Sequence, residues 1–303
     1  MLSILVPVYN FDARNLLQTL HEQGLASGQA FEIIVLDDAS DAKFVSLHQE
    51  LNHLEHFYYE PLEQNVGRSR IRNLLCQRAK FPYLLYLDCD AKVPDTHFLS
   101  RYFQHLKTNT ILCGGRTYQN QPPDNSAFFL HWLVGKAREE QSAKTRTKQG
   151  FQAFMSNNYV VPKAVQEAIP FEEAIQEYGH EDTLFGQELE AAGLNILHLD
   201  NPLEHIGLET ATVFLQKSKK AIHNLVYLHQ HYPDFQTKLL DTAFRMRRLG
   251  VSRRSVQLFE KQRDRLERNL LGRRPDLTLF DIWKLGFLLS CLQERGLKPQ
   301  KRD

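Results

Sequence analysis

Residues 81–90 read Phe81-Pro82-Tyr83-Leu84-Leu85-Tyr86-Leu87-Asp88-Cys89-Asp90, an apolar run that ends in two carboxylates. The run predicts a strand covered on both faces, and open α/β sheets bind their ligands at the carboxyl ends of such strands. Two carboxylates at that place can hold a hard divalent cation, which neutralises a diphosphate. Taken alone, the pair has a more common explanation, because acidic residues at strand ends are often solvated or cap a helix.

The composition bounds the class of protein. The chain has 303 residues, 42% of them hydrophobic, enough for one large domain with an appendage or for two modest domains. No stretch approaches the roughly 20 apolar residues of a membrane-spanning helix, and Met1 to Pro7 lacks the basic region of a secretory signal. The cysteines are widely spaced, which favours reduced thiols over disulfides or zinc ligands: Cys76, Cys89, Cys113 and Cys291. We therefore expect a cytoplasmic protein.

Charge is unevenly distributed along the chain. Residues 1–210 hold 17 Lys and Arg against 27 Asp and Glu, whereas residues 211–303 hold 20 against 9. This break predicts two domains, 1–210 and 211–303, the second of which is basic enough to face an anionic partner. Peripheral membrane contact through this region is one interpretation. A solvated helical face that balances an acidic catalytic half is another.

The first 115 residues alternate between two hydrophobic periods. Strands are predicted at Leu2–Val8, Phe31–Leu36, His56–Tyr59, Phe81–Leu87 and Thr110–Cys113, with helices between them at 11–24, 40–51, 66–80 and 95–106. This order is typical of a parallel, doubly wound sheet. A further helix is predicted at Thr183–Ala192, and we interpret the polar segment 139–150, which has no apolar stripe, as a mobile loop or lid.

The chain beyond Gly207 is predicted to be almost wholly helical. The four expected helices are Val213–His231, Phe235–Leu249, Ser255–Leu271 and Phe280–Leu292. Trp283, Phe287 and Cys291 recur at spacings of four on the last helix. Such a stripe packs on the protein's own core more often than on a membrane.

Five motifs occur in a fixed order: Val6-Pro7-Val8-Tyr9-Asn10, Asp37-Asp38-Ala39-Ser40, Asn65-Val66-Gly67-Arg68-Ser69-Arg70-Ile71-Arg72-Asn73, Asp88-Cys89-Asp90 and Gly179-His180-Glu181-Asp182. In this order they resemble the family-two inverting glycosyltransferases, which use nucleotide-sugar donors. The resemblance covers roughly residues 1–210. It implies the GT-A fold, an α/β, Rossmann-like, mostly parallel central sheet flanked by helices, here with a C-terminal helical extension.

The first two motifs suit a nucleoside. A base needs an apolar wall, offered by Pro7, Val8 and Tyr9, and a hydrogen-bond acceptor, offered by Asp38. The alternative is that Asp37 and Asp38 cap the helix that follows them.

The third motif suits phosphate. Gly67 lies near the start of the predicted helix, where backbone N–H groups and Arg68 or Arg72 could approach the phosphates or the base. The alternative is an ordinary capped amphipathic helix, which we prefer as the explanation of Arg70.

The resemblance also implies a metal site. Asp90 would bind Mn²⁺ or Mg²⁺ directly, and Asp88 would reach the ribose or a metal-bound water. His205 resembles the C-terminal histidine of metal-dependent members, although a lone histidine is more often structural. His198 and His180 are weaker candidates.

Inverting transfer requires a carboxylate that takes the proton of the acceptor hydroxyl. The resemblance implies that Asp182 is this base and that Glu181 orients the acceptor; the alternative is that both are first-turn acids stabilised by a helix dipole. The stretch Phe154–Tyr159 resembles the lining of the donor-sugar pocket and includes Asn158. Many relatives carry glycine where Ser156 or Asn157 stands, so this stretch does not identify the sugar.

The sequence therefore predicts a metal-dependent hexosyl- or N-acetylhexosaminyl-transferase that moves a sugar to a hydroxyl of a glycan or lipid-linked acceptor. The expected donor is a nucleotide sugar, with UDP as the favoured nucleotide. Nucleotidyl transfer is disfavoured, since residues 7–10 are not a glycine-rich phosphate loop. The other alternative is a non-catalytic module that binds glycan or nucleic acid. We expect no nucleic-acid partner, because the basic region does not interleave basic and aromatic residues.

Overall fold

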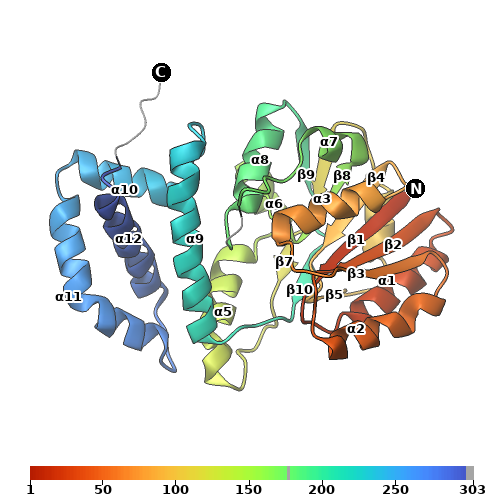
Figure 1. Cartoon of the computed structure of the whole chain (residues 1–303), viewed down its shortest axis with the longest axis horizontal. Coiled ribbons are helices and arrows are strands. Elements are labelled where there is room, and N and C mark those ends of the chain that lie inside the picture. The colour runs from red at the N-terminus through yellow and green to blue at the C-terminus, as the bar shows by residue number, and fades with distance from the viewer. Residues whose placement is uncertain (176–177, 298–303) are drawn as a thin grey trace. The chain divides into compact units, whose positions relative to one another are not determined.

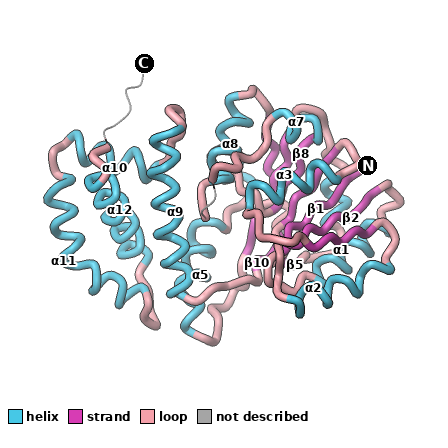
Figure 2. The backbone as a smooth tube through the Cα atoms, in the orientation of Figure 1, coloured by secondary structure: helices cyan, strands magenta, loops and turns pink. Residues whose placement is uncertain are grey.

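The computed structural model describes residues 1–175 and 178–297, which fall into two compact units. Among these residues, the first comprises 1–119, 138–175 and 181–207, and the second comprises 120–137, 178–180 and 208–297. All strands found in the described residues belong to the first unit, and the described part of the second is helical (Figure 2). The division into domains at residue 210 stays a proposal.

A seven-stranded sheet in the order β3-β2-β1-β4-β8-β6-β9 organises the first unit (Figure 1). Its strands are β1 Leu2–Val8, β2 Phe31–Asp37, β3 Phe57–Pro61, β4 Tyr83–Leu87, β6 Thr110–Cys113, β8 Asn158–Pro162 and β9 Asn195–His198. Only β8 runs antiparallel to its neighbours. The predicted α/β fold with a mostly parallel sheet is confirmed.

Helices cover both faces of the sheet, because the strands carry apolar side chains on both faces. Leu2, Ile4 and Val6 of β1 pack in one core cluster with α1 (Arg14–Ala26) and α4 (Phe98–Phe103). Leu5 packs in the other with α3 (Arg68–Arg78) and α8 (Glu181–Ala191). The unit also contains α2 Ala42–Gln49, α6 Ala143–Gln149, α7 Lys163–Ala168 and 3-10 turns at Glu50–His53 and Gly150–Ala153.

A second, three-stranded sheet consists of β5 (Ala91–Lys92), β10 (Leu203–His205) and β7 (Arg116–Thr117), with β10 in the middle. Its pairings set His205 opposite Ala91 and Leu203 opposite Arg116. Because β5 follows the Asp88-Cys89-Asp90 motif directly, this small sheet brings a histidine and an arginine from distant parts of the chain to the end of β4.

The segment 139–150 corrects one prediction. We expected a mobile loop, but Ala143–Gln149 is the helix α6, capped at its start by the Ser142 hydroxyl, which accepts from the Thr145 N–H at 3.2 Å. The helix is held by Arg146, only 2% exposed. Its guanidinium donates to the carbonyls of Cys113 at 2.9 Å, Gly114 at 2.8 Å and Leu199 at 2.7 Å. A buried arginine thus replaces the apolar stripe.

The helical unit contains α5 Phe129–Val134, α9 Ala211–His231, α10 Lys238–Arg248, α11 Ser252–Leu270 and α12 Leu277–Glu294, with a 3-10 turn at Ser126–Phe128; a π-helical turn, Gly135–Glu139, spans residues of both units. Hydroxyl or carboxylate side chains of Thr210, Thr237 and Asp276 cap α9, α10 and α12. The predicted stripe of Trp283, Phe287 and Cys291 is buried, as expected for a core. In the described ranges, no helix combines the length and hydrophobicity that crossing a membrane requires.

Candidate active site

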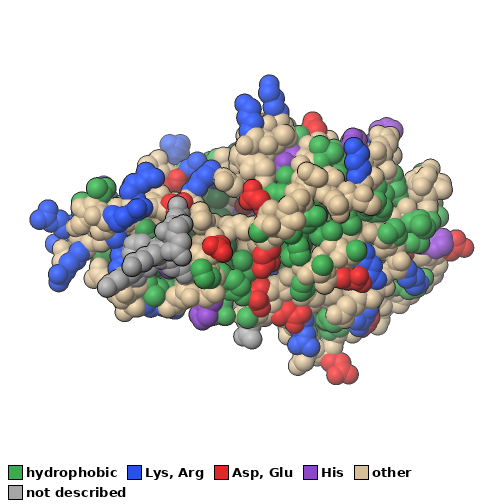
Figure 3. Space-filling view, turned by 90° about the horizontal axis from the view of Figure 1, so that it is seen from above, with side chains coloured by type: hydrophobic (Ala, Val, Ile, Leu, Met, Phe, Trp, Pro, Cys, Tyr) green, Lys and Arg blue, Asp and Glu red, His purple; other side chains and the backbone are tan. Residues whose placement is uncertain are grey.

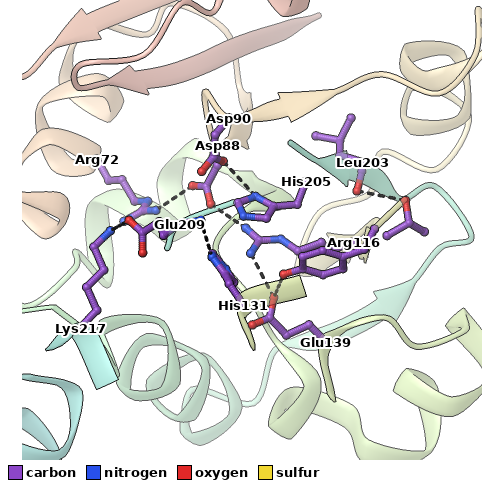
Figure 4. Close-up of polar contacts among 12 residues, drawn as sticks. Arg72, Asp88, Asp90, Arg116, His131, Glu139, Leu203, His205, Glu209 and Lys217 are labelled. Atoms are coloured by element: carbon purple, nitrogen blue, oxygen red, sulfur yellow. Dashed lines mark hydrogen bonds and ion pairs between the residues drawn. The ribbon is translucent and has the colours of Figure 1, made fainter. Parts of the chain in front are cut away.

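The carboxylate of Asp88, at the end of β4, is held by two arginines (Figure 4). Arg72 of α3 donates to one oxygen at 3.2 Å, and Arg116 of β7 donates to the other at 3.0 Å. The Asp88 N–H donates to the carbonyl of Asn157, which precedes β8. Two guanidinium groups thus converge on one carboxylate, and their planar N–H donors suit the oxygens of a diphosphate.

Asp90 faces His205, with 3.4 Å between a carboxylate oxygen and Nδ1 of the ring. Burial raises the pKa of Asp90, but His205 and the charges of Arg116 and Arg68 outweigh burial and lower this pKa to about 2. The carboxylate is therefore ionised at neutral pH. Gly207 lies against the Asp90 carboxylate. A Cβ at this position would lie 2.5 Å from the other Asp90 oxygen, so only glycine leaves that oxygen its place.

These two residues fit a divalent cation. The Asp90 oxygen nearest His205 is buried and accepts no hydrogen bond from the described residues, as expected of a ligand atom. Carboxylate and imidazole both suit Mn²⁺, and two adjacent ligands of an octahedral ion lie about 3 Å apart. Among the residues that the structure describes, no group of three His, Cys, Asp or Glu could hold a metal. Water or phosphate would therefore supply the remaining ligands.

Arg116 belongs to a network that the sequence analysis missed. Its second guanidinium nitrogen donates to Glu139 at 3.1 Å, and the Tyr118 hydroxyl donates to the same Glu139 oxygen. The Tyr118 ring meets His205 edge-on, with the centroids 5.3 Å apart. The network thus connects Asp88 to His205. Its one sequence signal was the position of Arg116 just after the strand Thr110–Cys113 and two glycines.

Asp38 anchors the loop that opens α3. Its two carboxylate oxygens accept from the N–H groups of Val66 at 2.6 Å and Gly67 at 3.1 Å. Burial raises the pKa of Asp38, and these two amides oppose the shift. Asp37 accepts from Ser40 N–H and the Tyr59 hydroxyl. Neither carboxylate caps α2, so the helix-capping alternative is wrong.

The predicted apolar wall is only partly at the surface. Tyr9 is 53% exposed and Pro7 is partly buried, but the Val8 side chain is 1% exposed and packs in the core. Val8 can therefore face a ligand only through its backbone, and its carbonyl accepts from the Asp38 N–H at 2.8 Å.

Helix α3 connects the acidic motif after β4 to the one that starts α8. Arg72 contacts Asp88, and Arg68, one turn earlier, lies 3.6 Å from Glu181. Gly67 precedes the helix with φ +83°, in the left-handed region that favours glycine. Within the part of the chain that the structure describes, Arg70 makes only a long, solvent-exposed contact to Glu173 at 3.9 Å, in keeping with an ordinary surface residue.

Asp182 has the properties of a general base. Burial and the neighbouring charge of Glu181 raise its pKa to about 6, against the opposing effects of Thr183 and Arg72. A carboxylate with this pKa is ionised at neutral pH and basic enough to accept a proton. Both acids also lie in the first turn of α8, so the helix-dipole explanation holds as well.

Other candidates have structural partners instead. Asn158 is 1% exposed; it accepts from the Tyr102 hydroxyl and donates to the carbonyls of Gly115 and Asn201, so it holds loops together. The two ring nitrogens of His198 lie 3.0 Å from Arg146 and from the Gly150 carbonyl, which leaves neither for a metal.

Residues 3–159 match the family model described as Glycosyl transferase family 2. Among curated protein sequences, none matches this chain.

Solved structures share the fold at low sequence identity. S. aureus TarS has 18% identity and a TM-score of 0.51 over 72% of this chain, which spans 38% of the TarS chain. A TarS fragment, 1–349, in complex with UDP-GlcNAc has 15% identity and a TM-score of 0.52, with 97% of this chain and 92% of the fragment covered. The mannosyltransferase PcManGT from Pyrobaculum calidifontis, in complex with GDP-Man and Mn²⁺, has 13% identity and a TM-score of 0.55, with 97% and 74% covered. These similarities confirm the predicted GT-A fold.

Proposed function

The chain belongs to glycosyl transferase family 2, and we propose that it transfers a hexosyl or N-acetylhexosaminyl group from a nucleotide donor to a hydroxyl of a glycan or lipid-linked acceptor, with inversion. One observation carries the proposal. Arg72 and Arg68, one turn apart on α3, contact Asp88 on the phosphate side and Glu181 on the acceptor side. These two contacts from one helix support a single site for the two acidic motifs.

In this proposal the donor lies across the ends of β1, β2 and β4. Tyr9 and Pro7 contact the base, and Asp88 reaches the ribose. The Asp38 carboxylate, which already accepts from the N–H groups of Val66 and Gly67, has further lone pairs with which it accepts from a base N–H. Arg72 and Arg116 face the diphosphate. UDP is the nucleotide we would test first; the structural neighbours include complexes with UDP-GlcNAc and with GDP-Man.

A divalent cation, Mn²⁺ or Mg²⁺, held by Asp90 and His205 would stabilise the negative charge of the departing diphosphate. The guanidinium groups of Arg72 and Arg116 add to this positive field without moving, since Asp88 fixes them both.

Asp182 accepts the proton of the acceptor hydroxyl as that oxygen attacks the anomeric carbon. The new carbon–oxygen bond forms on one face while the bond to the diphosphate breaks on the other, and the diphosphate leaves with the electron pair. Glu181, held by Arg68, orients the acceptor.

All four cysteines are free thiols, which supports a reducing compartment such as the cytoplasm.

A screen of nucleotide sugars tests this function. We expect one donor to be hydrolysed slowly in the presence of Mn²⁺, with release of nucleoside diphosphate, and hydrolysis to stop when the metal is chelated. A chain that bound glycan without hydrolysing or transferring from any donor would favour the non-catalytic module.

Gly207→Ala tests the metal site itself. The added Cβ would meet the Asp90 carboxylate at 2.5 Å and displace it, so we expect the Mn²⁺-dependent part of donor binding to fall by about tenfold or more. Ile206→Ala, at the neighbouring side chain that is 48% exposed, is the matched control and should bind as the wild type does. Equal Mn²⁺ affinity in both variants, measured by calorimetry, would remove Asp90 from the metal site.

A further inference from the structure

An apolar groove of about 640 Å³ runs between α11 and α12 in the helical unit. Its walls include Leu258 and Leu266 on α11, and Leu279, Ile282, Leu285 and Leu289 on α12. The helices approach closely at Gly286, where a Cβ would lie 2.3 Å from the Phe259 ring. The groove is therefore bounded by two tightly packed helices, and no residue assigned to sugar transfer lines it.

The rim of this groove exposes large aliphatic side chains. Leu258 is 63% exposed on one wall and Ile282 is 48% exposed on the other. Leu249 and Val251, in the turn between α10 and α11, do not line the groove but are also exposed, by 70% and 42%. Exposed aliphatic side chains on an apolar groove mark a surface that gains free energy when it leaves water.

A basic stripe on α11 lies directly beside this apolar rim. Arg254 and Lys261 stand four residues before and three after Leu258, so helical spacing places both next to it. Arg265, seven residues after Leu258, lies on the same face two turns further along. Arg268 continues the stripe one turn further. In the ranges that the structure describes, none of these four side chains forms an ion pair with a carboxylate. Lys and Arg side chains are visible over α10 and α11 at the left of Figure 3.

We propose that this face docks on an anionic lipid bilayer, with the groove and its rim in contact with lipid hydrocarbon and the stripe of Arg254, Lys261, Arg265 and Arg268 in contact with headgroup phosphates. An apolar face flanked by basic residues on the same helix is the pattern of interfacial membrane binding. The contact is peripheral and separate from the sugar-transfer chemistry.

Two other occupants fit the surface less well. Single-stranded nucleic acid needs exposed rings for stacking, but the one aromatic residue lining the groove, Phe259, is only 4% exposed. A second copy of the chain would bring two stripes of the same charge together.

Co-sedimentation of the full chain with lipid vesicles tests the proposal. We expect binding to vesicles that contain phosphatidylglycerol, little binding to pure phosphatidylcholine, and release at raised salt. The triple variant Arg254→Gln, Arg265→Gln, Arg268→Gln should bind about 100-fold more weakly, since each basic side chain near such a surface contributes roughly a factor of five. The double variant Leu258→Gln, Ile282→Gln should also weaken binding. All five substituted positions of the two variants are exposed, so the fold should stay intact.

The matched control removes the same charge from the other unit, by Lys107→Gln, Lys144→Gln and Lys148→Gln, all exposed. It should bind nearly as the wild type does. Equal binding to neutral and anionic vesicles, or equal loss in the control and in the arginine variant, would overturn the proposal. The proposal would also be overturned if the protein does not bind vesicles but forms dimers that Leu258→Gln abolishes, because a second copy would then cover the groove.

Discussion

The ends of the sheet strands and the outer face of α11 are both rich in arginine, but the two regions use it differently. At the sheet, Arg72 and Arg116 share the Asp88 carboxylate, and Arg68 lies beside Glu181. On α11, Arg254, Arg265 and Arg268 lie along the stripe that passes exposed Leu258, without a carboxylate partner in the described ranges. A set of internally paired charges indicates a site whose geometry is fixed in advance. A row of unpaired charges beside apolar side chains indicates a surface that a partner must complete.

The largest effect we expect within the paired region is that of Asp182→Asn. The amide keeps the shape but cannot accept the acceptor's proton, so transfer should fall by about 10³-fold, while donor affinity stays within about twofold. Initial rates and calorimetric donor titration separate the two quantities. Asp124→Asn, an exposed change of the same kind, is the control. A fully active Asp182→Asn enzyme would remove the base from the proposal.

Arg146→Ala should have the next largest effect, on stability. Removing the guanidinium leaves the buried carbonyls of Cys113, Gly114 and Leu199 without these donors, which should lower the free energy of unfolding by about 3 kcal/mol. Lys144→Ala, on the same helix but exposed, should change it by less than about 0.5 kcal/mol. Urea denaturation measures both. Similar values would mean that α6 does not depend on its buried arginine.

The pH profile of transfer sharpens the base assignment. Since Asp182 must be deprotonated and its pKa is raised to about 6, the rate at saturating donor should fall below that pH, approaching tenfold per unit. It should level off above pH 7. The limb below pH 6 should disappear in the residual activity of Asp182→Asn. A profile that stays flat to pH 5 would exclude a base of this pKa.

The smallest effect belongs to Arg70→Ala. Arg70 and Glu173 are 54% and 50% exposed and 3.9 Å apart, so their loss should change stability and donor affinity by less than about 0.5 kcal/mol. Arg72→Ala, two residues away on α3, should instead lose donor affinity clearly. If the two variants behave alike, contact with Asp88 is not what separates a site arginine from a surface arginine on this helix.

The sequence predicted the elements that hydrophobic period defines and missed those held by polar contacts. The apolar runs of β1, β2 and β4 were readable because their side chains pack on both faces. Helix α6 was not, because its buried anchor is Arg146, a residue type normally exposed. Asn158 was predicted at the donor pocket, yet its hydrogen bonds run to loops that adjoin only in the fold.

The metal pair shows the same limit. Asp90 was suggested by its place after a strand, but His205 lies 115 positions later, and the pairing of β5 with β10 joins them. Only the resemblance suggested His205. Arg116 was missed because its partners, Asp88 and Glu139, also come from distant segments.

A crystal structure with the donor and Mn²⁺ tests the central claim most directly, namely that the acids after β4 and at the start of α8 serve one reaction. We expect the anomalous signal of manganese between Asp90 and His205, the diphosphate beside Arg72 and Arg116, and the anomeric carbon facing Asp182. Manganese bound elsewhere, or a sugar turned away from Asp182, would contradict the claim.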